Sequence, residues 1–392
     1  MKARVLFWVQ HLLGIGHLRR AVTIARTLAE AGHDTLLVSG GLPVPDLPIA
    51  PARFHQLPPV RAQDRLFKIL CHPNGTIIDD AFRNRRRDEL LALYRAHRPD
   101  LVLTEMFPFG RRQLRFELVS LVEAARADPR RPLVVSSVRD ILVQSPKPER
   151  ITEMLDTFER YFDFVMIHGD ERLIPFGRTF PAAQRIADRI HYTGYVVDAD
   201  LERPPTGDAG RDEVIVSAGG GAVGGPLLGA ALDARPMTSL AGRRWRLLAG
   251  PNLPEGEFQA LLQRAQSGGD EGIFLERARR DFTTLLSNCA LSISQGGYNT
   301  VIETLCFADR AVIVPYAGGL ETEQGLRADL LAESGVFEVV EETALDGAAL
   351  AAAVERRLAG PSIRAAPRCD ANGRPKTLAL LERALAGREQ AS

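Results

Sequence analysis

The chain of 392 residues is long enough for two domains, each with its own buried core. Its hydrophobic fraction of 45% and charged fraction of 25% are typical of a globular protein. The 49 basic and 49 acidic side chains cancel, which removes the overall positive field that favours nucleic acid. We therefore expect no nucleic acid among its partners.

Cysteine spacing and the apolar runs indicate the compartment. The chain has four scattered cysteines, without a zinc pattern: Cys71, Cys289, Cys306 and Cys369. Scattered thiols are typical of a reducing compartment. The short apolar run Val5–Val9 predicts a buried strand and no signal peptide, and no run approaches the roughly 20 apolar residues of a membrane span. We expect a cytoplasmic protein and leave open its oligomeric state and a peripheral contact with the inner membrane face.

Strands and helices alternate through the first half of the chain. Arg4–Val9 is predicted as a strand, a glycine loop follows, and Leu18–Ala31 has helical spacing. Four more strands are predicted: Thr35–Val38, Asp100–Thr104, Pro132–Ser137 and Phe164–His168. Strands that alternate with helices form a parallel sheet with right-handed crossovers.

The same alternation restarts after a stretch rich in proline and glycine. Strand Glu213–Ser217 is followed by further candidates: Arg244–Ala249, Ile273–Leu275, Ala290–Ser294, Ala311–Pro315 and Val336–Val340. We predict an α/β protein with two Rossmann-like parallel-sheet domains. Residues 1–200 form the acceptor-side domain, 201–212 a linker, 213–372 the nucleotide-sugar domain, and 373–392 a helix that packs back on the first domain.

A candidate catalytic pair lies where the first strand meets the first helix. Gly14 and Gly16 let the backbone approach a ligand, and the helix N-terminus favours anions. His17 follows at the helix start, where the positive end of the dipole favours a neutral imidazole base. Glu105 comes just after strand Asp100–Thr104, at the same sheet edge, where it would hold the imidazole tautomer. A helix-capping histidine and a salt-bridged glutamate are the alternative.

Two aromatic and two basic side chains come directly after Glu105. Phe107 and Phe109 beside Arg111 and Arg112 are compatible with an acceptor pocket or with a site for an acceptor phosphate. A loop that packs against the core explains them nearly as well.

A first glycine cradle follows strand Glu213–Ser217. Gly219, Gly220 and Gly221 can bind a diphosphate through backbone N–H groups. With Gly224 they also match G-x-G-x-x-G, so a dinucleotide site is an alternative. That motif requires an acidic residue at the end of the next strand, where Gly250 and Pro251 stand instead.

A second cradle begins after strand Ala290–Ser294. It contains a glycine turn and the start of a helix: Gln295, Gly296, Gly297, Asn299 and Thr300. Glu303 lies one helical turn on, from where its carboxylate can bond both ribose hydroxyls. Glu323 and Gln324 open the helix after the next strand and can bond sugar hydroxyls, although a carboxylate that favours the helix dipole also explains Glu323. The pair Asp198 and Asp200 lies at the start of the stretch rich in proline and glycine, away from both cradles, so we expect no metal site.

The segment Asp281–Gln324 resembles the donor-binding region of GT-B glycosyltransferases, in particular the MurG-like peptidoglycan GlcNAc transferase family. The resemblance rests on "DFTTLLSNCALSISQGGYNTVIETL", "AVIVPY" and "ETEQGLRA". It implies that Glu303 binds ribose and that Glu323 and Gln324 contact the donor sugar. Ser217–Gly221 resembles the diphosphate loop of that family, and Gly14–His17 resembles its N-terminal glycine loop.

The resemblance implies two domains that face each other across a cleft, with inverting, metal-independent transfer from a nucleotide-diphosphate sugar and UDP favoured. We expect no cofactor; His17, held by Glu105, would deprotonate the acceptor. Arg20 stands where that family has proline, and "GIGHLRR" instead resembles the loop of nucleotide-sugar hydrolases on the same fold. The acceptor therefore stays open between a glycolipid, a saccharide, a small molecule and water. A hydrolase, an epimerase and a nucleotide-sugar-binding regulator are the rival functions.

The first half of the chain also contains a run of basic residues in a predicted helix near residue 85. It consists of Arg83, Arg85, Arg86 and Arg87. We weigh two interpretations, contact with an anionic membrane surface or phosphorylated acceptor, and a solvated helix face.

Overall fold

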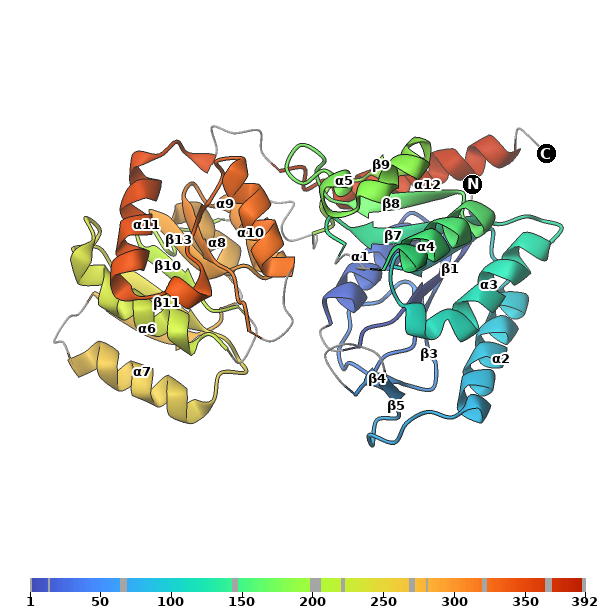
Figure 1. Ribbon diagram of the computed structural model, residues 1–392, viewed down its shortest axis with the longest axis horizontal. Helices are drawn as coiled ribbons and strands as arrows, with labels where there is room; N and C mark the ends of the chain where they lie inside the picture. Colours follow the sequence, from blue (N-terminus) through green and yellow to red (C-terminus); the bar gives the residue numbers. More distant parts are fainter. Residues whose placement is uncertain are drawn as a thin grey trace. The chain divides into compact units, whose positions relative to one another are not determined.

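The computed structural model describes residues 2–12, 15–63, 69–142, 147–197, 206–219, 223–267, 272–279, 281–318, 323–363 and 369–389. The chain divides into two compact units (Figure 1). The N-terminal unit combines Met1–Asp198 with Asp370–Ser392, and the C-terminal unit is Ala199–Cys369. Among the described residues, no helix combines the length and the apolar character that a membrane crossing needs.

The N-terminal unit is built on a parallel sheet with the strand order β3-β2-β1-β6-β7-β8-β9. Its strands are β1 (Arg4–Val9), β2 (Asp34–Ser39), β3 (Arg53–Gln56), β6 (Leu101–Glu105), β7 (Leu133–Arg139), β8 (Phe164–His168) and β9 (Ile190–Tyr192). Its helices are α1 (Gly16–Glu30), α2 (Asp80–His97), α3 (Arg115–Ala127), α4 (Pro148–Tyr161), α5 (Phe176–Thr179) and α12 (Gly373–Glu389). The short strands β4 (Arg61–Ala62) and β5 (Leu70–Cys71) form a separate antiparallel pair.

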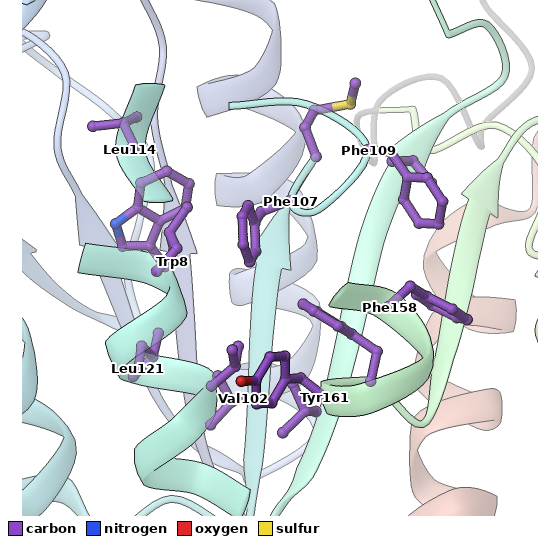
Figure 2. Packing of buried hydrophobic residues seen from close by; sticks show 14 of the residues in the cluster. Trp8, Val102, Phe107, Phe109, Leu114, Leu121, Phe158 and Tyr161 are labelled. Carbon is purple, nitrogen blue, oxygen red and sulfur yellow. The ribbon is translucent and has the colours of Figure 1, made fainter. Parts of the chain in front are cut away.

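The sheet is covered on both faces because its strands are apolar on both sides. In β1, Leu6 and Trp8 belong to one buried cluster, together with residues of α2, α3 and α4. Val5 and Phe7 point to the opposite face, where the cluster includes residues of α1 and α12. Figure 2 shows part of the first cluster, in which Trp8 packs near Leu114 and Leu121 of the α3 region.

The C-terminal unit has a second parallel sheet, with the order β12-β11-β10-β13-β14-β15. Its strands are β10 (Val214–Ser217), β11 (Trp245–Ala249), β12 (Ile273–Arg277), β13 (Leu291–Gln295), β14 (Ala311–Val314) and β15 (Glu338–Val339). Its helices are α6 (Gly225–Ala234), α7 (Glu255–Ser267), α8 (Phe282–Asn288), α9 (Tyr298–Phe307), α10 (Glu323–Glu333) and α11 (Gly347–Ala359). The predicted α/β class with two parallel sheets is confirmed.

The structure adds to the sequence analysis at three places. Strands β3, β4, β5 and β9 were not predicted, since all four are short, and β3 and β9 also lie at sheet edges. The described end of the proposed linker belongs to the C-terminal unit, where Asn288 donates to the carbonyls of Gly207 and Ala209. Helix α12 lies in the N-terminal unit, and its Arg374 donates to Thr27 of α1 at 3.0 Å.

The basic run on α2 does not form a uniform solvated face. Arg86 is fully buried and donates to both oxygens of Glu117 at 2.8 Å. Glu117 also accepts from the Trp8 indole at 3.1 Å. Arg83 and Arg87 are paired with acidic neighbours on the surface. The expectation of four exposed cations is therefore wrong at Arg86, whose carboxylate partner is 31 residues away in sequence.

Removal of the Glu117 charge should destabilise the N-terminal unit strongly. Glu117→Gln leaves the Arg86 guanidinium buried without a counterion, which costs ~3–5 kcal/mol in comparable sites. The measurement is urea unfolding followed by Trp8 fluorescence in a Trp245→Phe background, which makes Trp8 the sole tryptophan.

Arg87→Gln is the matched control on the same helix. Its partner Asp88 is exposed, so the free energy of unfolding should change by less than about 0.5 kcal/mol. Equal effects of the two substitutions would show that the buried pair does not stabilise the unit.

Candidate functional site

The first candidate site lies at the topological switch point of the N-terminal sheet. Strand β1 pairs with β2 on one side and with β6 on the other, so the crossovers after β1 and β6 leave in opposite directions. Ligands of open α/β sheets bind at the carboxyl ends of strands at such a point. His17 is the second residue of α1, the first helix after β1, and Glu105 is the last residue of β6. Glu105 thus ends the strand, one residue later than predicted.

His17 and Glu105 contact each other. His17 Nδ1 lies 2.9 Å from Glu105 Oε1. The Glu105 side chain is fully buried, whereas the His17 side chain is 15% exposed. The predicted neighbourhood of the two residues is therefore present in the structure, while their catalytic role remains a proposal.

Burial and neighbouring charges determine the protonation states of Glu105 and His17. Burial alone would raise the pKa of Glu105, but the Arg20 charge and the hydrogen bonds from His17 and Ser137 outweigh it and lower that pKa well below its usual range. Burial and the nearby Arg111 charge lower the pKa of His17 to about 3. An ionised carboxylate accepts the Nδ1–H of a neutral imidazole, which leaves the lone pair on Nε2. Among the described residues Nε2 has no hydrogen-bond partner, so His17 has the form of a general base.

Arg20 is a third member of this site, and its sequence position predicts no such role beyond a departure from the MurG-like pattern. It lies three residues after His17, on the same face of α1, and its Nη2 donates to Glu105 Oε1. Its side chain is only 5% exposed. The helical spacing of His17 and Arg20 was the available signal, and the buried carboxylate explains why a guanidinium is needed there.

Glu105 is also connected to a buried polar chain across the ends of the neighbouring strands. Ser137 of β7 donates to Glu105 Oε2 at 2.7 Å, and Ser137 Oγ lies 3.0 Å from His168 Nε2. His168 Nδ1 lies 2.8 Å from the hydroxyl of Thr193, just after β9. Since Ser137 gives its one proton to Glu105, it accepts from the Nε2–H of His168. This chain holds the carboxylate in one orientation from the side opposite His17.

The two phenylalanines after Glu105 line the core. Phe107 and Phe109 are 1% and 4% exposed, and the Phe109 ring packs against Phe158 at a centroid distance of 5.4 Å (Figure 2). The structure therefore contradicts a pocket framed by their rings. Arg112 turns to the surface and donates to Glu153 at 2.9 Å, whereas Arg111 lies within electrostatic range of His17 and Glu105.

The second candidate site lies at the switch point of the C-terminal sheet. Strand β10 pairs with β11 on one side and β13 on the other. Gly219 follows β10 with φ of 66°, in the left-handed region that favours glycine. Gly14, Gly220 and Gly221 lie outside the described residues. Gln295 ends β13, and its Nε2 donates to the Val223 carbonyl at 3.4 Å, which ties the two predicted cradles together.

The glycine turn after β13 leads directly into α9. Gly297 is the N-cap residue and makes no side-chain capping bond, so the first N–H groups of the helix remain available to an anion. A side chain at Gly296 would meet Gln324 Cβ at 3.3 Å and Pro315 Cα at 3.4 Å, so a larger residue would need these neighbours to shift slightly. Asn299 and Thr300 lie in the first turn of α9, and the half-buried Glu303 follows one turn later.

The structure also places the two residues predicted to contact the donor sugar. Gln324 Oε1 accepts from the Tyr316 amide at 3.2 Å. Glu323 is buried and accepts from Arg327 Nη2 at 2.8 Å, while the Arg327 guanidinium lies 5.1 Å from the centre of the Tyr298 ring. Glu323 thus helps to join α10 to α9, and its contact with a sugar stays a prediction.

Comparisons with known proteins fit this architecture. Residues 277–378 match the glycosyltransferase family 28 C-terminal domain. No curated protein sequence matches the chain. Together with the structural comparisons that follow, the domain match supports a glycosyltransferase.

Solved structures share the fold over nearly the whole chain. MurG from Acinetobacter baumannii has a TM-score of 0.66 at 13% identity, with 97% of this chain and 99% of that chain covered. CalG4, the calicheamicin glycosyltransferase, has a TM-score of 0.65 at 18% identity, with 99% of both chains covered. Phytolacca americana UGT2, complexed with UDP-2fluoro-glucose and pterostilbene, has a TM-score of 0.59 at 16% identity, with 96% and 94% covered. The chain has the GT-B fold.

The buried neutral histidines predict a loss of stability in acid. Burial and the Arg20 charge lower the pKa of His168 to about 3, as burial does for His17. Below pH ~6.5 the unfolded chain binds protons that the folded chain does not bind. The free energy of unfolding therefore decreases by ~1.4 kcal/mol per pH unit for each of His17 and His168 as the pH falls from about 6.5 toward 3. Urea unfolding of the N-terminal unit between pH 7.5 and 5 measures this slope.

His168→Gln should reduce the slope of the unfolding free energy against pH by the contribution of one histidine, ~1.4 kcal/mol per pH unit. This reduction is expected whatever the substitution does to the free energy of unfolding at pH 7.5. His55→Gln is the control, since His55 is a half-buried histidine on the edge strand β3. An unchanged slope in His168→Gln would show that His168 is not held neutral.

Proposed function

We propose that the protein is an inverting, metal-independent glycosyltransferase that moves a sugar from a nucleotide-diphosphate sugar to an acceptor hydroxyl. The observation that carries the proposal is His17 with its Nδ1 bound to a buried, ionised Glu105 and its Nε2 lone pair unpartnered among the described residues. The match of residues 277–378 to a glycosyltransferase domain, which includes Glu303, supports the donor side. A UDP-linked donor fits the UDP-sugar complex of the plant glycosyltransferase with the same fold.

The proposed reaction is a single displacement. The acceptor oxygen forms a bond with the anomeric carbon while His17 Nε2 takes its proton. The bond from that carbon to the phosphate oxygen breaks, and the nucleoside diphosphate leaves with the electron pair. Attack opposite the leaving group inverts the anomeric centre. Glu105 stabilises the imidazolium that forms, as carboxylates do in other histidine–acid pairs.

The leaving group is stabilised by backbone donors in this scheme. The uncapped start of α9 offers N–H groups to the developing negative charge. Such donors are fixed before the reaction, so no rearrangement is needed when the charge appears. We assign to Glu303 the hydrogen bonds with the ribose hydroxyls of the nucleotide. We assign to Glu323 and Gln324 the hydrogen bonds with the hydroxyls of the transferred sugar.

The second candidate function is a nucleotide-sugar hydrolase. It is favoured by the position and contacts of Arg20. Arg20 stands where the MurG-like pattern has proline, and it bonds directly to Glu105. In the hydrolase scheme His17 activates water in place of an acceptor hydroxyl. Candidate nucleotide sugars incubated without acceptor, in EDTA, separate the two functions. Stoichiometric release of free sugar supports the hydrolase, isomerised donor supports an epimerase, and donor binding without any turnover supports a regulator.

His17→Ala should lower turnover by at least about 100-fold, because a positioned base contributes about 10²–10⁴-fold. Donor affinity should be retained, since the proposed donor contacts lie in the C-terminal unit. The measurements are kcat by nucleoside diphosphate release and donor affinity by calorimetry.

Arg19→Gln is the control, because Arg19 is exposed on the same turn of α1. It should leave turnover within about twofold. Unchanged turnover in His17→Ala would remove His17 from the mechanism.

Glu303→Ala should weaken the binding of the free nucleoside diphosphate by about 10–100-fold, the loss expected for hydrogen bonds to a charged group. Thermal shift against a series of nucleoside diphosphates measures this, since a ligand of the folded state raises the melting temperature. Asp329→Asn removes an exposed carboxylate from the neighbouring α10 and should leave the affinity unchanged. Equal affinities in Glu303→Ala and wild type would contradict the ribose assignment.

A further inference from the structure

Two of the four cysteines lie side by side in the C-terminal unit. Cys306 is in the last turn of α9, Cys369 is the last residue of the unit, and their Sγ atoms are 3.1 Å apart. Both are free thiols in this structure, and both residues are half-buried. A disulfide joins two sulfurs at about 2.05 Å, so a movement of about 1 Å brings this pair to bonding distance.

The other two cysteines have different surroundings. Cys71 is fully buried in the N-terminal unit, and Cys289 is buried with its thiol donating to the Leu286 carbonyl at 3.2 Å. A thiol that the protein covers is inert, whereas a partly exposed one reacts with small oxidants. The half-buried pair is therefore more accessible to an oxidant than Cys71 or Cys289.

The chain is attached to the end of α9 at a second place before it reaches Cys369. After α11, the Ile363 amide donates to the Asp309 carbonyl at 2.8 Å, and the Ser362 hydroxyl donates to the Asp309 carboxylate. Asp309 lies two residues past the last residue of α9. Described residues on both sides of positions 364–368 thus lie beside the C-terminal end of α9, so the fold itself brings the two thiols together.

The residue after Cys369 is anchored in the N-terminal unit. The Asp370 amide donates to Asp170 Oδ2 at 2.9 Å, and its carbonyl accepts from the Tyr195 amide at 2.6 Å. Gly194 has φ of 79° and passes so close that a side chain there would meet the Asp370 carbonyl oxygen at 2.6 Å. One peptide bond therefore separates Cys369 from a residue that is held in the other unit.

Helix α9 is also the helix to which we assign donor binding. Its uncapped start lies at Gly297, and the half-buried Glu303 comes three residues before Cys306. Residues three apart are neighbours on a helix surface. A covalent bond at Cys306 would therefore act on the same helix that would bind the nucleotide.

We propose that Cys306 and Cys369 are a redox modification site, at which a hydroperoxide forms a reversible disulfide that lowers turnover. Hydrogen peroxide first transfers a hydroxyl group to one sulfur, so that an S–O bond forms, the O–O bond breaks and one water leaves. The second sulfur attacks the first, the S–S bond forms, the S–O bond breaks and another water leaves. The two thiols lose two protons and two electrons, which reduce the peroxide to two water molecules.

The disulfide would restrict the place where the chain passes from one unit to the other. Hinge movements are absorbed by a few residues in such connections, and these movements limit turnover in many enzymes. Scattered thiols predict a reducing compartment, so we take the dithiol as the resting form and the disulfide as the form made under oxidative conditions. The effect on turnover rests on the proposed function, whereas formation of the bond does not.

Peptide mass spectrometry of the full chain tests the bond. The protein is reduced with dithiothreitol, separated from it, exposed to hydrogen peroxide and blocked with N-ethylmaleimide. A peptide that links Cys306 to Cys369 should appear while Cys71 and Cys289 remain thiols, and dithiothreitol should return the pair to two thiols. Absence of the link in wild type, or a sulfinic acid at either position in its place, would overturn the inference.

Cys289→Ser is the matched control, since serine keeps a donor for the Leu286 carbonyl and leaves the pair intact. It should form the link as the wild type does. A link that disappears in Cys289→Ser would show that the half-buried pair does not react by itself, and this result would contradict the proposal.

A second arm measures turnover as the release of nucleoside diphosphate from a nucleotide sugar, which a transferase and a hydrolase both produce. Oxidation should lower kcat of the wild type by at least about threefold, and dithiothreitol should restore it. Cys306→Ser and Cys369→Ser should keep their kcat after the same treatment, because neither can form the bond.

Two results of this arm would overturn the regulatory role. One is an unchanged kcat in wild type that carries the complete link, and the other is an equal loss of kcat in wild type and Cys369→Ser. Absence of turnover in the reduced wild type counts against the proposed function instead, and the mass-spectrometric test of the bond is independent of it.

Discussion

A single buried carboxylate organises the N-terminal site. Glu105 has no exposed side-chain surface, and an isolated charge there would be too costly to keep ionised. Arg20, His17 and Ser137 each donate to it, and their combined effect overcomes the desolvation that opposes the charged form. Because the carboxylate is ionised, His17 keeps its proton on Nδ1 and presents a basic Nε2. The tautomer of the proposed base is thus set by a residue 88 positions away in sequence.

The parallel sheet makes this arrangement possible. Residues at the carboxyl ends of β1, β6, β7 and β8 meet along one edge, although long crossovers separate them in the chain. Glu105 ends β6, Ser137 lies near the end of β7 and His168 ends β8, and together with His17 at the start of α1 they form a continuous polar chain. The same geometry in the C-terminal unit brings Gln295 at the end of β13 next to the turn after β10. Each unit therefore places its polar side chains at its own switch point.

The arginines give the N-terminal site its chemical character. His17 is a weak base in the free protein, because burial and, after it, the nearby charges of Arg111 and Arg139 disfavour the imidazolium and lower its pKa.

The sequence by itself determined the two-domain α/β architecture, because apolar strand runs and helical periodicity are local signals. Most predicted strands lie within one or two residues of the observed ones, as for Arg4–Val9 and Phe164–His168. It also placed His17, Glu105, the glycine turn at Gly296 and Gly297, and Glu303 after strands of the two sheets, while their roles stay predictions.

Only the tertiary structure decided what these residues contact. Whether Arg86 is a surface cation or a buried partner of Glu117 depends on which helices pack together, and local sequence carries no such information. The same holds for Arg20 on Glu105, for Ser137 and His168 behind that carboxylate, and for Phe107 and Phe109 in the core. Charge pairing and burial act through space between distant segments, so they are fixed only when the sheet and its helices have assembled.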